Sequence, residues 1–116
     1  MKEEVSPFVP LSPATLHILL TLAGEEMHGY AIMQEVQRQS EGKYKLGPGT
    51  LYDNLQKLMD RGLVEELGRR AGGDDPRRRY YKLSSFGRGV LSAEIARLED
   101  VVRVGKLRLQ AKPRRA

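Results

Sequence analysis

The feature that most limits the fold of this chain is an apolar seam near its C-terminus. Apolar residues there alternate four and three positions apart over about three heptads, namely Leu91, Ile95, Leu98, Val102, Gly105 and Leu109. This spacing lines them along one side of a helix and is typical of a helix that packs against another helix. Ser84 precedes the seam as a candidate N-cap. We therefore expect one long helix over residues 84–110.

The rest of the chain is too short to cover so long a helix. With 116 residues it has room for one domain with one modest core. That domain could itself cover Leu91 and Ile95, which lie near it. Farther along, only the domain or a second copy could cover the seam. We therefore predict a homodimer with an interface of Leu91, Ile95, Leu98 and Val102. The first helix of one copy is a further candidate for this interface.

Three shorter helices are expected before the seam. Ser12-Pro13 combines an N-cap with a proline at the first helical position, which predicts a helix over residues 13–23. A second helix opens at His28 and ends near residue 40. Gly47-Pro48 starts a third, which ends near Arg61 with a cation in its last turn and a glycine after it.

Two strands are expected between the third and the last helix. Residues 63–67 and 79–83 are predicted to be extended, and the Gly- and Asp-rich residues 70–76 to form the turn between them. Such a two-stranded hairpin must rest on the helices to be stable. Side chains alternate across a strand, so one of Tyr80 and Tyr81 should face the core and the other the solvent.

Positive charge is concentrated in two blocks. The chain carries a net charge of +5, yet residues 1–67 carry −4, residues 68–82 carry +4 and residues 103–116 carry +6. A localised basic block indicates a polyanionic partner such as a nucleic acid. A solvated face or a frayed basic tail is the alternative for each block.

Other classes of protein fit the sequence poorly. It has no nucleophile elbow, no phosphate-binding glycine loop and no carboxylate pair with a supporting base, so we expect no enzyme and no cofactor. The two histidines, His17 and His28, lack metal-ligand spacing, so no metal site is expected. The absence of cysteine, of a signal peptide and of a long apolar run favours a cytoplasmic protein without a membrane partner.

The predicted order is three short helices, a hairpin and one long helix. This order predicts a mainly α (α+β) fold: a winged helix-turn-helix domain with a two-stranded wing and a long C-terminal dimerisation helix. Its parts are an N-terminal arm (1–11), the winged domain (12–83), the dimerisation helix (84–110) and a basic tail (111–116). In this fold the third helix must present a narrow polar face to the major groove. Gly49, near its start, has little bulk and would let backbone amides approach phosphate.

Four ordered motifs resemble the PadR family of bacterial transcriptional regulators. They are His28-Gly29-Tyr30 with Ile32; Gly47-Pro48-Gly49-Thr50-Leu51-Tyr52 with Leu55, Leu58 and Gly62-Leu63-Val64; Arg77-Arg78-Arg79-Tyr80-Tyr81-Lys82-Leu83; and Ser84, Phe86-Gly87 and Leu91. The match covers about residues 16–98. The resemblance implies a homodimeric repressor whose third helix enters the major groove beside the wing, with a ligand site near the dimer interface.

The resemblance also suggests which residues meet DNA. It implies that Tyr30, Thr50 and Tyr52 contact the DNA backbone or brace against it, and that the second wing strand approaches the duplex. Adding Gly49 and the exposed Lys57 gives the candidate DNA-binding set: Tyr30, Gly49, Thr50, Tyr52, Lys57, Arg77, Arg78, Arg79 and Tyr81. Asp53 departs from the expected charge, and it could accept a hydrogen bond from a cytosine amine or simply be solvated.

Two functions remain as hypotheses. The first is a sequence-specific regulator whose partners are double-stranded DNA, a second copy of the chain, and a small-molecule effector bound between the last helix and helix 13–23. The second is a winged-helix protein-interaction module without DNA-binding activity. The arginine run at residues 77–79 favours the first, because guanidinium groups bind phosphates well.

Overall fold

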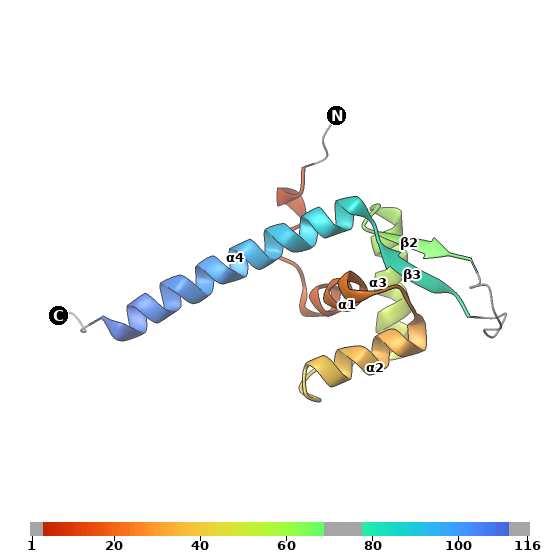
Figure 1. The fold of residues 1–116 in the computed structure, drawn as a ribbon, viewed down its shortest axis with the longest axis horizontal. Coiled ribbons are helices and arrows are strands. Elements are labelled where there is room, and N and C mark those ends of the chain that lie inside the picture. The colour runs from red at the N-terminus through yellow and green to blue at the C-terminus, as the bar shows by residue number, and fades with distance from the viewer. Residues whose placement is uncertain (1–3, 69–77, 112–116) are drawn as a thin grey trace.

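Three short helices and a small sheet gather at one end of the molecule, and a single long helix leads away from them (Figure 1). The computed structural model describes residues 4–68 and 78–111. Its elements in chain order are η1 (Ser6–Phe8), α1 (Pro13–Gly24), β1 (Met27–His28), α2 (Gly29–Gln39), α3 (Pro48–Asp60), β2 (Val64–Leu67), β3 (Tyr80–Leu83) and α4 (Ser85–Gln110). Arg77, the turn at residues 70–76 and residues 112–116 of the tail lie outside the described residues.

Local capping groups fix the starts of the helices close to where the sequence predicts them. The Ser12 side chain accepts a hydrogen bond from the Thr15 amide at 3.2 Å, and Ser84 accepts one from the Gly87 amide at 2.9 Å. At α2 the cap is His28, whose Nδ1 accepts from the Ala31 amide at 3.3 Å. Each cap satisfies an amide that has no partner within its helix, which stabilises the first turn.

The sheet contains the predicted two-stranded hairpin of β2 and β3 and, in addition, a third strand, β1, that the sequence did not predict. Its strand order is β1-β3-β2, and all neighbours are antiparallel. β1 has only two residues, too few for a period of two to show in the sequence. It places His28 opposite Tyr80, and the two rings meet edge to face with centroids 5.4 Å apart.

The same strand overturns the expectation that one of the two wing tyrosines faces solvent. Tyr80 and Tyr81 are both only 4% exposed. Tyr81 belongs to the core of the domain, whereas Tyr80 is covered from the other side by the His28 ring. Alternation along β3 therefore separates two buried environments.

One apolar core joins the helices, the sheet and the start of α4. Its largest side chains, each no more than 1% exposed, are Ile18, Leu19 and Leu22 of α1, Ile32 of α2, Leu51 and Leu55 of α3, and Leu63. Val90 and Leu91 add the first turns of α4 to this core. Leu91 is 5% exposed, so packing within its own chain accounts for it, and its assignment to a dimer interface is corrected.

Beyond this core, α4 projects as an uncovered helix (Figure 1). Ile95 is 39% exposed and Val102 is 53% exposed, while Leu98 is half-buried. The seam thus divides into a covered start and an open continuation.

The N-terminal arm packs on α4 instead of standing free. The ring of Phe8 meets Phe86 edge to face, with centroids 5.3 Å apart. Farther along, the Leu11 amide donates a hydrogen bond of 3.1 Å to the Glu94 carboxylate, which is only 1% exposed. Arg97 donates two more hydrogen bonds to the same carboxylate, at 2.7 and 3.0 Å. These contacts tie the arm to the long helix.

Candidate nucleic-acid interface

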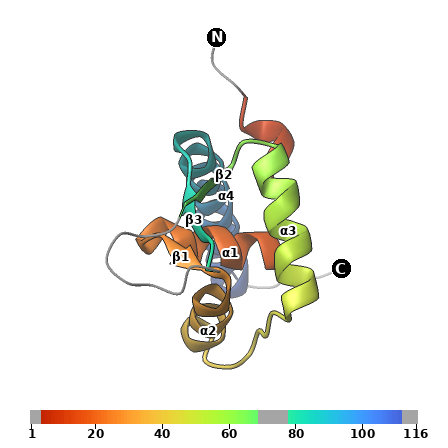
Figure 2. The same cartoon turned by 90° about the vertical axis from the view of Figure 1, so that its right-hand side faces the viewer.

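The outer face of α3 is polar and carries paired charges. Leu51, Leu55 and Leu58 bury one side of the helix, so helical spacing turns Asp53, Gln56, Lys57 and Asp60 outward. On that side Lys57 Nζ lies 3.1 Å from Asp53 Oδ2, and Gln56 Nε2 donates to Asp60 Oδ1 at 3.0 Å. Figure 2 shows α3 running along one edge of the domain, from the linker after α2 up to the arm. An exposed helix of this kind has the width that a major groove admits.

On one flank of α3 lies a cleft of about 180 Å³, which we call the wing cleft. It lies where the start of α2, the side of α3 and the start of β3 meet. Five of the predicted DNA-binding residues line it together with two residues of α2's first turn and cap: Tyr30, Tyr52, Arg78, Arg79, Tyr81, His28 and Gly29. Segments more than fifty positions apart in the sequence thus converge on one small site.

A close contact between α2 and α3 sets the position of the Tyr52 ring. The phenol of Tyr52 lies so close to Gly29 that an added Cβ would overlap its oxygen. Tyr52 is 48% exposed and Tyr30 is 61% exposed, so both rings also face solvent. The sequence marks Gly29 only as part of a motif. Its contact with the Tyr52 ring is seen only when the two helices pack together.

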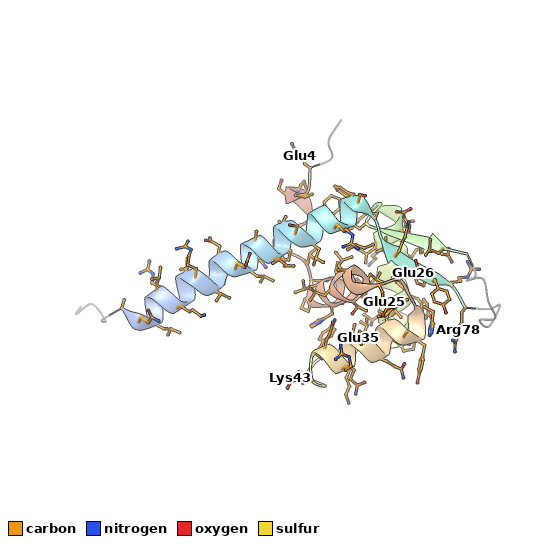
Figure 3. The ribbon with its side chains drawn as sticks, in the orientation of Figure 1. Glu4, Glu25, Glu26, Glu35, Lys43 and Arg78 are labelled. Carbon is orange, nitrogen blue, oxygen red and sulfur yellow. The ribbon has the colours of Figure 1, made fainter. Side chains whose placement is uncertain are left out.

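The two arginines of the wing cleft differ in how they are paired. Arg79 Nη1 donates to Glu66 Oε1 on the neighbouring strand β2 at 2.7 Å, and this hydrogen bond raises the pKa of Arg79. Arg78 has no carboxylate partner within the described part of the chain. It lies at the wing end of the sheet in Figure 3. Arg78 is therefore the guanidinium of this cleft that is available to an incoming anion.

Tyr81 sits deeper than a residue that reads DNA directly. Only 4% of it is exposed, and burial raises the pKa of its phenol, with the Glu66 carboxylate adding to the increase. The neutral phenol forms part of the cleft wall. Its burial fits the bracing of neighbouring groups better than a broad contact with a ligand.

The opposite flank of α3 borders a second cleft, also of about 180 Å³, which we call the arm cleft. The sequence does not reveal this cleft, because its residues come from the arm, α1, α3 with its C-cap Arg61, and the residue before β2. Its lining comprises Phe8, Pro10, Leu11, Ser12, Thr15, Asn54, Lys57, Leu58, Arg61 and Leu63. Ser12 Oγ donates to Thr15 Oγ1 at 3.0 Å, and Thr15 Oγ1 donates to Asn54 Oδ1 at 3.2 Å. This chain of hydrogen bonds joins α1 to α3 inside the cleft.

Comparisons with known proteins agree on the family. The model of the transcriptional regulator PadR-like family matches residues 18–93, which is more than half of the chain. The chain belongs to the PadR-like family. It is 36% identical over 88 residues to transcriptional regulator Rv3488 of Mycobacterium tuberculosis, covering 76% of this chain and 78% of that protein. A PadR-like chain is a transcriptional regulator and not an enzyme.

Solved structures share the fold. A PadR family transcription regulator from Clostridium difficile is 21% identical with a TM-score of 0.72, over 84% of this chain and 99% of that one. Bacillus subtilis PadR, solved in complex with operator DNA, is 22% identical with a TM-score of 0.64. That match covers 74% of this chain and 48% of that one. These likenesses confirm the winged helix-turn-helix fold of the PadR-like chain.

The remaining predicted DNA-binding residues of this PadR-like chain lie away from the wing cleft. Gly49 and Thr50 are exposed in the first turn of α3, where the Thr50 carbonyl accepts a hydrogen bond from Asn54 Nδ2 at 2.8 Å. Lys57 lines the arm cleft. Arg77 is outside the described residues.

Two other surface depressions of the PadR-like fold differ in chemistry. One, of about 450 Å³, lies beside the start of α2 and is bordered by Glu25, Glu26 and Glu35 (Figure 3). An Arg38 side chain pairs with Glu35 and lowers the pKa of its carboxyl. The other is an open groove of about 530 Å³ along α4, lined by Ile95, Leu98, Glu99, Val102, Arg103 and Lys106.

Neither a metal site nor a membrane span is found in the described part of this PadR-like chain. Within residues 4–68 and 78–111, no three metal-ligating side chains come together. None of the helices in those residues has both the length and the apolar character needed to cross a bilayer.

Proposed function

We propose that this PadR-like regulator acts by binding double-stranded DNA, with α3 in the major groove and the wing cleft on the sugar-phosphate backbone. The observation that carries the proposal is the convergence of Tyr30, Tyr52 and Arg78 beside the start of α2. It is supported by the DNA-bound state of Bacillus subtilis PadR, which shares the fold. Such a partner places the protein in the cytoplasm.

The chemistry of the wing cleft suits a phosphate group. Guanidinium and phenol groups donate hydrogen bonds to phosphate oxygens, and the bonds from guanidinium are charge-assisted. The first turn of α2 contains no acidic residue, and the positive end of the helix dipole favours an anion placed beside it. A cleft of about 180 Å³ has room for one phosphate but not for a base pair. The cleft therefore positions the protein on DNA, and the α3 face reads the sequence.

We also propose that the functional unit is a homodimer that represses by occupying its operator. Ile95, Leu98 and Val102 form an open apolar groove along α4. Within the described part of the chain nothing covers this groove, and its heptad spacing fits a second helix of the same kind. Two copies related by a two-fold axis would present two α3 helices to the two halves of a palindromic operator.

A small-molecule effector, where one exists, is proposed to bind between α4 and α1 at this dimer interface. Its walls would be aliphatic, because α4 has no aromatic residue beyond Phe86. A structure determined with a bound effector tests this placement. Finding the molecule against another surface contradicts it.

The proposed function is tested with duplexes recovered by in vitro selection from a random library. Binding of the full chain is measured by fluorescence anisotropy at several salt concentrations, with Arg78→Ala and the control Lys43→Ala. Lys43 lies at the far end of α2 from Arg78 (Figure 3). We expect Arg78→Ala to weaken binding to selected and random duplexes alike, and to reduce the slope of log K against log salt by about one unit. Lys43→Ala should bind like the wild type.

The same experiment separates the two functional hypotheses. Recovery of a two-fold symmetric site supports a dimeric DNA-binding regulator. A chain that enriches no sequence and shows no salt-dependent binding to any duplex is instead a winged-helix interaction module.

A further inference from the structure

The two clefts beside α3 lie on opposite flanks of the helix. Tyr52 borders the wing cleft, and Arg61 borders the arm cleft. Arg61 follows Tyr52 by nine positions, which is about two and a half turns of helix and therefore half a turn out of phase. The two clefts also have the same volume, about 180 Å³ each. Helix α3 is thus bordered on both sides by a site of similar size.

The arm cleft favours an anion. Its lining contains two cations, Lys57 and Arg61, and no carboxylate among the described residues. Arg61 makes no ion pair within the described part of the chain. Lys57 pairs with Asp53 at 3.1 Å, but both side chains are more than half exposed, so this pair is weak and easily exchanged.

The arm holds the inner wall of this cleft in place. Ser12 and Thr15 use their hydroxyl protons in the hydrogen-bond chain to Asn54, so they order the wall and leave the two cations as the donors. Leu11, which precedes them, is tied to the buried Glu94 carboxylate on α4. A preorganised cationic cleft of this kind binds an anion with little loss of conformational entropy.

We propose that the arm cleft binds a backbone phosphate of the DNA strand opposite to the strand held at the wing cleft. The inference rests on the proposed function. A major groove about 12 Å wide is filled by a helix about 10–12 Å across, so the two flanks of the helix face the two strands. Arg61 and Lys57 meet one backbone, and Arg78 with Tyr30 and Tyr52 meets the other. Arg61, for which the sequence indicates only a place at the end of the third helix, becomes a DNA-binding residue.

The experiment is phosphate-ethylation interference on a selected duplex, with the full wild-type chain, Arg61→Ala, Arg78→Ala and the control Lys43→Ala. For the wild type we expect interfering phosphates on both strands of each half-site, across the major groove from one another. Arg61→Ala should lose the interference on one strand, and Arg78→Ala should lose it on the other. The salt slope of Arg61→Ala should fall by about one unit, with about a tenfold loss of affinity for all duplexes.

Arg61 caps the C-terminus of α3, so a helix defect must be separated from a lost contact. Arg61→Lys keeps a cation and should restore most of the salt slope. Thermal melts should show that both variants are folded at the temperature of the binding experiment. An Arg61→Ala chain that melts like the wild type and keeps every interfering phosphate overturns the proposal. If the wild type itself shows no salt-dependent binding, the proposed function fails and not the arm cleft alone.

A free anion is the other source of the same chemistry. The full chain is titrated with inorganic phosphate against chloride at equal ionic strength, and amide chemical shifts around Arg61 are followed. We expect no saturable response below millimolar phosphate. Saturation at lower phosphate, together with an unchanged DNA salt slope for Arg61→Ala, overturns the assignment to the DNA backbone.

Discussion

Single side chains decide how α4 joins the winged domain, and Gly87 is the clearest case. It lies in the first turn of α4, where an added methyl group would overlap the Leu63 carbonyl oxygen and crowd the Leu83 side chain. The backbone carbonyl cannot move away without disturbing Ser84, whose hydroxyl donates to the same oxygen at 3.0 Å. The docking of the long helix thus depends on the absence of one carbon atom.

Gly87→Ala should therefore lower the free energy of unfolding by at least about 2 kcal/mol, as overpacking does in a tightly packed core. The measurement is urea denaturation followed by circular dichroism. Gly89→Ala is the matched control, because its methyl would meet only Val5 Cγ1 at an ordinary 3.5 Å. The control should be neutral or slightly stabilising, since alanine favours a helix. Equal behaviour of the two variants would contradict the packing argument.

Gly29 offers a second test, this time of DNA binding. In Gly29→Ala the new methyl displaces the Tyr52 phenol, which can swing into solvent because it is the exposed end of a long side chain. We expect the free energy of unfolding to change little. Affinity for duplexes should fall about tenfold, because one hydrogen bond from the Tyr52 phenol to a phosphate is lost. Gly24→Ala, which adds a methyl where no atom lies within 4 Å, serves as the control. Unchanged affinity in Gly29→Ala would show that the seated position of Tyr52 is not needed.

Glu94 makes stability depend on pH. Hydrogen bonds from the Arg97 side chain, and then from the Leu11 amide, lower the pKa of this carboxyl below its ordinary value, although burial opposes them. A carboxyl with a lowered pKa in the folded state stabilises the fold above its unfolded pKa. That contribution is lost as pH falls through the folded value.

We accordingly expect Glu94→Gln to lower the free energy of unfolding at pH 7 by about 2 kcal/mol, the usual effect of losing a charged hydrogen bond. The difference from the wild type should shrink as the pH falls below the ordinary glutamate pKa of about 4.3 and then through the lower pKa of the native carboxyl. Denaturation at a series of pH values gives both quantities. Glu65→Gln, at an exposed position of β2, should change neither. A constant difference across the whole pH range would exclude this role for the Glu94 charge.

Of the helices and strands, α3 is the element whose outer face is proposed to read the DNA sequence. Asp53 there pairs with Lys57, and the sequence left two roles open for it, acceptance of a cytosine amine or simple solvation. The structure places the carboxylate on the exposed side of the helix, 65% accessible. The two roles predict opposite results for its removal.

If Asp53 is only solvated, Asp53→Asn removes a charge that repels phosphate and should strengthen binding to selected and random duplexes alike, by about threefold. If Asp53 accepts from a cytosine, the selected site alone should weaken, by about tenfold. We expect the first result, because the carboxylate is already paired with Lys57. Parallel titrations on both duplexes decide between them.

Helix boundaries were predictable because they depend on neighbouring residues. Ser12 and Ser84 cap helices through hydrogen bonds to residues three positions ahead, a relation that is visible in the sequence. The third strand was not predictable, because Met27 and His28 become a strand only by pairing with β3, more than fifty positions away.

The candidate site divides in the same way. Tyr30, Tyr52 and Arg78 lie in sequence motifs of the PadR family, so the resemblance to that family was enough to predict them as candidate DNA-binding residues. The arm cleft depends on Thr15 meeting Asn54 and on Leu11 meeting Glu94, contacts that span 39 and 83 positions. No local period or motif encodes such contacts, and only the packed domain brings the groups together.

The molecule as a whole is elongated, with principal extents of 65, 40 and 23 Å, because α4 projects from the domain. Its open groove is the basis of the proposed dimer. A double substitution, Leu98→Glu with Val102→Glu, would place carboxylates on that groove, and burying them without partners is costly. We expect this variant to be monomeric in sedimentation equilibrium at micromolar concentration and to bind DNA much more weakly.

Val104→Glu is the control for the dimer, because Val104 lies on the other side of α4 and is already 42% exposed. It should sediment like the wild type. A wild-type chain that is monomeric at micromolar concentration would refute the proposed interface outright.

The outer face of α3 has a consequence for the time that a regulator spends finding its operator. In the proposed complex the attraction for DNA comes from cations on the two flanks, whereas the middle of the helix carries Asp53 and Asp60, both held in side-chain pairs. Flank contacts are equally strong at every base pair, so they keep the protein on the duplex without fixing its register. Paired carboxylates that face the major groove contribute little binding free energy at a sequence other than the operator. With nonspecific attraction on the flanks and sequence reading in the middle, the protein can diffuse rapidly along the DNA duplex and stop where the base edges match.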